Sequence, residues 1–326
     1  MHTLESEYLA LKTEGVIDEP AATLAVALDR GDLFSVFVEL RFALYASVLA
    51  ITTGIGMVIK NNLDRIGPVT LMVVLALVAA ACYASAVRTK LRGEARSIGG
   101  EYVLLLGALI LSADLGYAEA QFHWLGAHWS WQLLVLAMLH AVTAYVFNSR
   151  LVLSVSLTSL AGWFGIQNQF GIETLFVFEN TLRQTGNQAL VCAVVIMVWR
   201  EVHQRTGQTQ AFIEVLEHFA AHTSFWGALA LSFDATTRYV GMLIVIGLAI
   251  INIRKGLRHQ QEAFVVYGII YAALGLCVFA ANTIRDDLLI ALLELITIVV
   301  ATTLLWRCHS RLKVNGTNSM PPHSAR

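Results

Sequence analysis

Charged side chains are scarce in this chain of 326 residues, and that scarcity limits what it can be. Asp, Glu, Lys and Arg together make up 14% of the sequence, whereas soluble domains carry about 25%. Hydrophobic residues supply 57%, and the mean hydropathy is +0.65. So little charge cannot give the fold a polar surface, so lipid must be part of its solvent. The net charge of −1 also argues against nucleic-acid binding, which requires a basic face.

Cysteine, proline and the common catalytic motifs are also rare or absent. The four cysteines lie far apart without a C-x-x-C pair, which argues against a zinc site or a disulfide framework. Only four prolines occur, so the chain is not a Pro-rich disordered protein. No phosphate-binding loop, H-E-x-x-H, G-x-S-x-G or dinucleotide fingerprint is found. The sequence therefore favours a non-catalytic role and predicts no cofactor.

The first 34 residues form an acidic start, with seven Asp and Glu against only Lys12 and Arg30. A secretory signal needs a basic start and an early apolar core, so this segment is expected to stay in the cytoplasm. Glycines and a capping Asp18 divide it into two short amphipathic helices. Helices this short are marginal alone. We therefore predict a partner-binding arm over residues 1–34, whose apolar stripe comprises Leu4, Tyr8, Leu11, Leu24 and Leu28.

Apolar segments separated by short polar breaks fill the rest of the chain. They predict an all-α, polytopic membrane helix bundle over residues 35–313 with about ten transmembrane helices, followed by a disordered cytoplasmic tail over 314–326. With both ends inside, 17 of the 22 Lys and Arg residues lie on the cytoplasmic side, as the positive-inside rule requires. The segments at 186–200 and 219–234 are the shortest candidates. The ten segments are 42–60, 67–87, 101–117, 130–148, 150–167, 186–200, 219–234, 238–254, 263–282 and 287–306.

Several motifs in the first half resemble a known family. The arm reads L-x-x-x-G-x-I-D-E-x-A from Leu11 to Ala21, and the first span, T-T-G-I-G-M-V-I-K-N-N-L-D-R-I-G, runs into an Asn-rich turn. Q-F-H-W and W-S-W-Q-L-L follow the third span. This order is similar to bacterial membrane proteins catalogued as domain of unknown function 2157, over roughly residues 5–165. The resemblance implies a multi-pass protein of the bacterial inner membrane and brings no assigned reaction.

The loop after the third span gathers two histidines, His123 and His128, among three tryptophans. Two imidazoles five residues apart could bind a metal if the loop folds back. The alternative is an interfacial aromatic belt, in which the tryptophan rings lie at headgroup depth. The belt is the reading that the sequence favours.

A second group, Glu214, His218 and His222, lies around the start of the seventh segment, with Glu217 next to His218. Spacings of four residues place these side chains on one face of a helix. The face could form part of a metal site, although the second Glu-x-x-His pair of carboxylate-bridged di-iron bundles is missing. The simpler interpretation is a solvated polar face.

Ionisable residues inside the apolar segments form the third group: Glu294, Asp114 and His140. Such a residue is costly in hydrocarbon and is a functional hypothesis by default. Glu294 is the leading candidate for a proton-linked or ligand-linked role. The alternative is a protonated carboxyl that bonds to a neighbour such as Thr297. His140 could ligate haem only if a second histidine lay at matching depth, and the sequence offers none.

These observations predict a scaffold, sensor or accessory subunit of a membrane assembly, with the bilayer and a protein that binds the arm as its partners. A transporter of a small solute or ion, with Glu294 on its path, is the alternative. A membrane redox subunit that uses the histidine clusters, with haem or a metal, is the second alternative.

Overall fold

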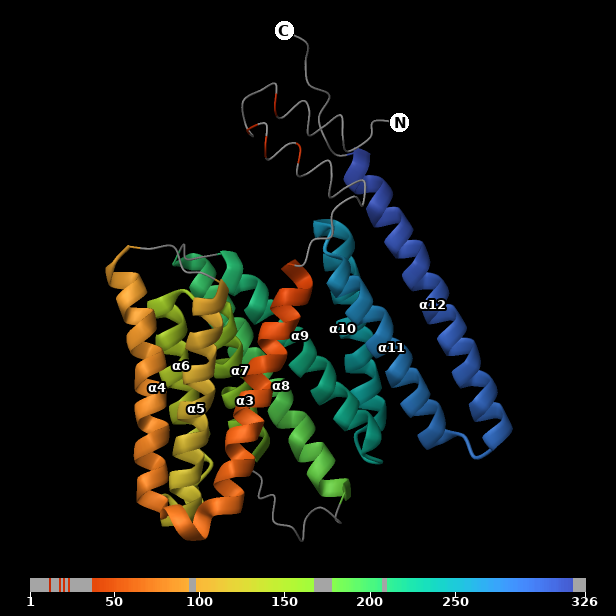
Figure 1. The fold of residues 1–326 in the computed structure, drawn as a ribbon. Helices are drawn as coiled ribbons and strands as arrows, with labels where there is room; N and C mark the ends of the chain where they lie inside the picture. The colour runs from red at the N-terminus through yellow and green to blue at the C-terminus, as the bar shows by residue number, and fades with distance from the viewer. Residues whose placement is uncertain are drawn as a thin grey trace. The chain divides into compact units, whose positions relative to one another are not determined.

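The computed structural model describes residues 37–93, 98–166, 178–206 and 210–318, together with Lys12, Asp18, Pro20 and Thr23. Within these ranges it contains ten α-helices, one 3-10 turn and no strand (Figure 1). The predicted all-α fold is therefore confirmed for this part of the chain, and each predicted apolar segment corresponds to one α-helix. In chain order the elements are α3 (Phe37–Ile66), α4 (Pro68–Leu91), α5 (Ile98–Phe122), η1 (Gly126–His128), α6 (Trp131–Phe147), α7 (Arg150–Ile166), α8 (Phe178–Arg205), α9 (Gln210–Phe233), α10 (Arg238–His259), α11 (Glu262–Thr283) and α12 (Asp287–Asn318).

The turn between α3 and α4 lies later in the chain than the sequence suggested. Asn61 and Asn62 were expected to form it, but both lie inside α3. The chain instead turns at Gly67, whose φ of 73° is readily adopted only without a Cβ. Pro68 follows at the first helical position, where its fixed φ suits a helix start. The Gly-Pro pair therefore sets the boundary, and the expectation of an Asn-rich turn is wrong.

Among the residues that the structure describes, five helices are long and apolar enough to cross a membrane by length and composition: Pro68–Leu91, Gly99–Phe122, Arg238–His259, Glu262–Thr283 and Asp287–Cys308. Shorter apolar helices cover Phe42–Gly54 and Trp131–Phe147. The two segments that the sequence marked as shortest fall in α8 and α9, which are not among the five. The described residues thus agree with a membrane helix bundle, while ten spans with both ends inside stay a prediction.

The chain folds into two compact units, Met1–Leu111 and Ser112–Arg326. The boundary falls inside α5, and the sequence patterns do not predict it.

In the first unit, α4 approaches α5 closely at Gly107, where an added Cβ would lie 2.8 Å from Cβ of Cys82. The predicted arm over residues 1–34 lies almost wholly outside the described residues, including its whole apolar stripe.

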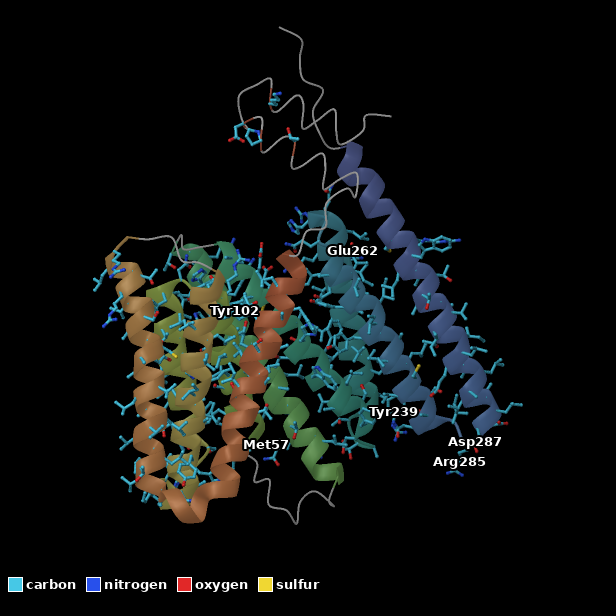
Figure 2. All side chains as sticks on the ribbon, in the orientation of Figure 1. Met57, Tyr102, Tyr239, Glu262, Arg285 and Asp287 are labelled. Atoms are coloured by element: carbon cyan, nitrogen blue, oxygen red, sulfur yellow. The ribbon has the colours of Figure 1, made fainter. Side chains whose placement is uncertain are left out.

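In the second unit, successive helices run in alternating directions. Glu262, at the start of α11, lies at one end of this unit, and Tyr239, Arg285 and Asp287 lie at the other (Figure 2). The first of these ends also holds the α6–α7 and α8–α9 connections, because Arg150 at the start of α7 contacts Glu214 near the start of α9. We call it the basic end, since it carries Arg150, Arg200, Arg205, Arg254, Lys255 and Arg258.

The core of the second unit lies where α9, α10 and α11 meet. Phe225 stacks on Tyr271 with ring centroids 4.5 Å apart. Val245 and Ala249 of α10 pack against this pair. By contrast, α12 lies beside α11 at the edge of the unit (Figure 1). Only 6% of its most apolar stretch is buried against the rest of the protein. A helix with so much exposed apolar surface requires lipid or a protein partner around it.

Candidate functional site

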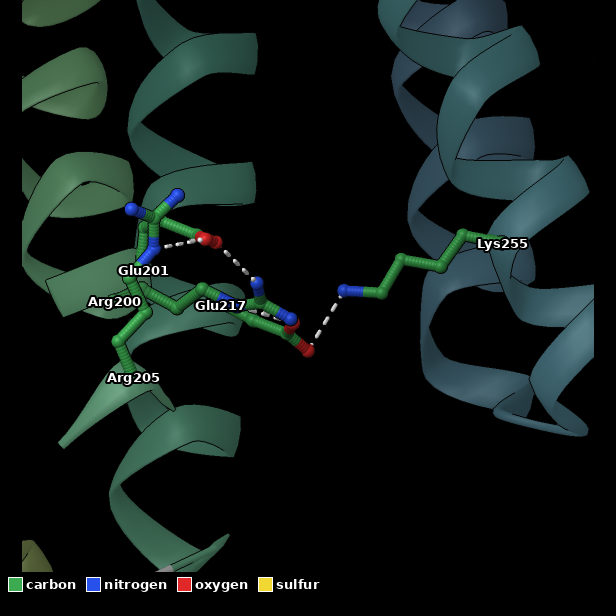
Figure 3. Close-up of polar contacts among 5 residues, drawn as sticks. All are labelled: Arg200, Glu201, Arg205, Glu217 and Lys255. Atoms are coloured by element: carbon green, nitrogen blue, oxygen red, sulfur yellow. Dashed lines mark hydrogen bonds and ion pairs between the residues drawn. The ribbon is translucent and has the colours of Figure 1, made fainter. Parts of the chain in front are cut away.

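A buried carboxylate at the basic end links three helices (Figure 3). Glu217 of α9 is 8% exposed. Its Oε1 accepts the Arg200 Nε hydrogen bond at 2.9 Å and lies 2.6 Å from Arg200 Nη2. Its Oε2 lies 2.7 Å from Lys255 Nζ on α10. Arg200 lies near the end of α8, so one carboxylate joins α8, α9 and α10. We call Arg200, Glu217 and Lys255 the Glu217 clamp.

More exposed charges surround the clamp. Arg200 Nη1 lies 3.3 Å from Glu201 Oε2, and Arg205 Nε donates to Glu201 Oε1 at 3.0 Å. Arg150 and Glu214 approach to 3.8 Å with both side chains about half exposed. Exposed pairs of this kind contribute about 0–1 kcal/mol each. The buried Glu217 contacts therefore dominate the electrostatics of the basic end.

The two cations of the clamp are partly shielded from water, with side chains 22% exposed at Arg200 and 29% at Lys255. Lys255 Nζ also lies 3.9 Å from the centre of the Phe264 ring on α11, a cation–π geometry. A buried carboxylate is tolerated only when it is paired and hydrogen-bonded. The clamp meets that condition with two cations, so its present geometry fixes the helices relative to one another.

The residues of the predicted face, Glu214, His218 and His222, contact two different parts of the structure. His218 stacks on Phe264 at 4.8 Å, and His222 Nδ1 lies 2.9 Å from the Tyr271 hydroxyl oxygen. Both imidazoles also contact the Tyr267 ring on α11. Glu214 instead faces Arg150. The two histidines thus share a face, as expected from their spacing, and that face packs on the aromatic side chains of α11.

The metal prediction for these histidines stays untested. Among the residues that the structure describes, no group of three or more His, Cys, Asp and Glu side chains is arranged to hold a metal ion. The arrangement that is present is a set of aromatic and hydrogen-bonded contacts between α9 and α11. Such contacts set the distance between the two helices and hold the imidazoles in fixed orientations.

A second interior network joins α6 to α8 near the same end. The Tyr145 hydroxyl lies 3.0 Å from His203 Nδ1 and accepts the Trp199 indole N–H at 2.9 Å. Phe212 of α9 packs edge-on against the Tyr145 ring. No sequence pattern groups these residues, because Tyr145 lies more than fifty positions before the other three along the chain.

His140 lies at the centre of α6 and is fully buried. Its Nε2 lies 2.8 Å from the Ser112 hydroxyl oxygen on α5, whereas its Nδ1 has no hydrogen-bond partner in the described residues. A hydrogen bond at one ring nitrogen is compatible with ligation through the other, so the haem alternative for His140 stays untested. The predicted intramembrane histidine is therefore held as a polar contact between two helices.

Asp114 and Glu294 differ in their surroundings. Asp114 on α5 is 8% exposed, and its Oδ1 has no hydrogen-bond partner among the described residues. Glu294 is half-buried on α12. The suggested partner of Glu294, Thr297, instead donates its hydroxyl to the Leu293 carbonyl oxygen at 2.7 Å. In the part of the chain that the structure describes, no hydrogen bond or ion pair joins any two of Glu294, Asp114 and His140, and their roles stay predictions.

The outer-loop histidines lie at the end of the second unit that faces away from the α6–α7 turn. His123 follows α5 with a φ of 49°, and His128 lies in η1. Phe122 stacks on Trp124 at 5.6 Å, and Trp131 contacts Trp163 edge-on. The tryptophans of the loop stay largely exposed, which agrees with an interfacial aromatic belt.

Together, the fold and these sites define a membrane protein with several apolar helices. Residues 10–153 match the family described as Predicted membrane protein (DUF2157). The match lies inside the range that the sequence motifs indicated and confirms the resemblance over that segment. No curated protein and no solved structure matches the chain. The Glu217 clamp lies beyond the matched segment.

The residue spacing in the sequence indicates the histidines around Glu217, but it does not indicate the two cations that bind Glu217. Arg200 and Lys255 are far from Glu217 along the chain and looked like ordinary residues of cytoplasmic loops. One available signal was the predicted topology, which places the ends of α8 and α10 on the same side as the start of α9. That signal identifies a side of the membrane, and only the packing of the helices selects the partners.

Proposed function

We propose that the chain is a non-catalytic component of the bacterial inner membrane that acts as a scaffold, sensor or accessory subunit. The main support for this proposal is the Glu217 clamp, in which both oxygens of a buried carboxylate are bound by cations from two other helices. Both Glu217 oxygens are used in contacts between helices, which suits a protein whose membrane part presents a stable surface.

The aromatic contacts of α9 with α11 support the same proposal. His218 and His222 are packed against Phe264, Tyr267 and Tyr271, so the polar groups of this region are used to join helices. The basic end, which lies on the cytoplasmic side in the predicted topology, would present this rigid surface to the same compartment as the acidic arm.

The predicted arm supplies the test. Deleting residues 1–31 should abolish co-purification of a defined protein partner from bacterial membranes, because the apolar stripe with Leu11 and Leu24 would be lost. The measurement is quantitative mass spectrometry after in-membrane crosslinking of tagged protein. A chain that lacks residues 319–326 is the matched control and should keep the partner. Equal recovery of every crosslinked protein from both truncated chains would contradict the proposal.

Transport through a path that includes Glu294 remains the alternative. Its support is the position of a half-buried carboxylate on α12, where an ionisable group is costly unless it has a role or a partner. Under the scaffold proposal, Glu294→Gln leaves proton and solute flux in proteoliposomes at the level of protein-free vesicles, as for the unmodified chain. Flux that the unmodified chain supports and Glu294→Gln abolishes would replace the scaffold proposal with the transporter.

A further inference from the structure

A mostly apolar cavity of about 550 Å³ lies in the second unit among α5, α6 and α7. Ligand pockets in proteins commonly measure about 300–1,000 Å³, so a small organic molecule fits. The cavity lies at the α5–α6 connection, at the end of α6 that faces away from the basic end. None of the clamp residues lines it, so it is independent of the function proposed above.

Among the described residues, Glu119 supplies the only Asp or Glu side chain in the cavity lining. Both of its carboxylate oxygens accept the Leu125 backbone N–H, at 3.2 and 3.1 Å. This contact holds the side chain in place but uses one donor for two oxygens. Of the residues that the structure describes, His123 is the basic side chain in the lining, no Lys or Arg lines the cavity, and none forms an ion pair with Glu119. The carboxylate therefore keeps acceptor capacity for a positively charged ligand.

The remaining lining favours a cation with an apolar body. Trp129 is 44% exposed and lines the rim, and an indole face attracts an ammonium group. Leu133 and Leu136 form an apolar wall from α6. Ser112 also lines the cavity and connects it to the buried His140. A carboxylate and an indole beside an apolar wall are the elements that recognise organic ammonium ions.

We propose that this cavity binds a small organic ammonium compound, with the charged head between Glu119 and Trp129 and the apolar body against Leu133 and Leu136. A free amine and the ethanolamine headgroup of a phospholipid share this chemistry. The predicted topology places the cavity on the periplasmic side, within reach of either source.

The test uses the full chain in dodecyl maltoside, a detergent without an ammonium group. Benzyltrimethylammonium is the probe, and neopentylbenzene is its uncharged analogue of the same shape. Calorimetric titration should show saturable binding of the cation and at least about tenfold weaker binding of the analogue, which corresponds to about 1.4 kcal/mol. No saturable binding of the cation, or equal affinity for the two probes, would overturn the proposal.

Variants on α5 locate the site. Glu119→Gln keeps an oxygen for the Leu125 N–H but removes the charge, and should weaken binding of the cation about tenfold. Gly116→Leu should block binding without changing charge, because a Cβ at Gly116 meets only Gln132 Nε2 at 3.6 Å and the rest of the side chain fills the cavity. The controls are Glu101→Gln and Gly99→Leu on the same helix, and both should bind normally. Unchanged affinity in either cavity variant would place the site elsewhere and overturn the proposal.

Binding measurements in lipid nanodiscs distinguish a phospholipid headgroup from a free amine as the source of the ammonium group. If the cation binds in phosphatidylglycerol discs but is displaced when phosphatidylethanolamine is added, the headgroup is a ligand. If phosphatidylethanolamine leaves the affinity unchanged, the ligand is a free amine. Either result supports the ammonium site, provided that Glu119→Gln reduces binding in both kinds of disc.

Discussion

Glu217→Gln is expected to destabilise the second unit by about 3 kcal/mol, the scale measured when one partner of a buried ion pair is removed. The substitution leaves Arg200 and Lys255 near one another without their shared anion. Lys255→Met should cost less, because Glu217 keeps its two contacts with Arg200. Thermal unfolding of the purified protein in detergent, followed by tryptophan fluorescence, measures the order of these effects.

The double variant Glu217→Gln/Lys255→Met should be more stable than Glu217→Gln alone, since it also removes the Lys255 ammonium, which loses its anion in Glu217→Gln, whereas Arg200 keeps its contact with Glu201. Such a gain is the coupling that a double-mutant cycle isolates. Glu201→Gln serves as the control and should change stability by less than about 1 kcal/mol, because Glu201 is half exposed. A Lys255→Met variant that is as unstable as Glu217→Gln would show that the three charges do not act as a clamp.

Gly186→Ala is expected to weaken the contact between α8 and α9 by about 1–3 kcal/mol, the usual cost of overpacking. A Cβ at Gly186 would lie 2.9 Å from the Gly227 carbonyl oxygen, and a Cβ at Gly227 would lie 2.9 Å from the Gly186 carbonyl oxygen. The clash involves backbone on both sides, so the two helices must move apart. The same thermal measurement should give a lower midpoint for Gly186→Ala and for Gly227→Ala.

Gly247→Ala provides the matched control, because it is expected to raise the stability that Gly186→Ala and Gly227→Ala lower. It lies inside α10, and a Cβ there meets nothing within 4 Å. Removing an interior glycine from a helix gains about 0.5–1 kcal/mol, so this variant should unfold at a higher temperature. Destabilisation of the same size in all three variants would indicate that close helix contact is not the reason.

The candidate site was only partly predictable, and His218 and His222 show where the limit falls. Their spacing predicts a shared helical face, and the structure shows one. Nothing in the spacing predicts that the face packs on Tyr267 and Tyr271 of α11. The predicted polar face is local information, whereas its partners depend on which helix lies opposite.

The sequence by itself determined the positions of the helices that the structure describes and their apolar character. Both follow from hydropathy, a property of consecutive residues, because backbone groups in lipid must be satisfied within each helix. Even the missed turn at Gly67 moved only one boundary.

Tertiary structure alone decided which polar groups meet. Glu217 binds cations from the ends of two other helices, and Ser112 reaches His140 across the α5–α6 loop. These pairings depend on the rotation and crossing of helices, which small residues such as Gly186 and Gly227 set through close packing. Hydropathy carries no information about that rotation, so the Glu217 clamp and the Glu119 cavity emerge only when the helices are packed together.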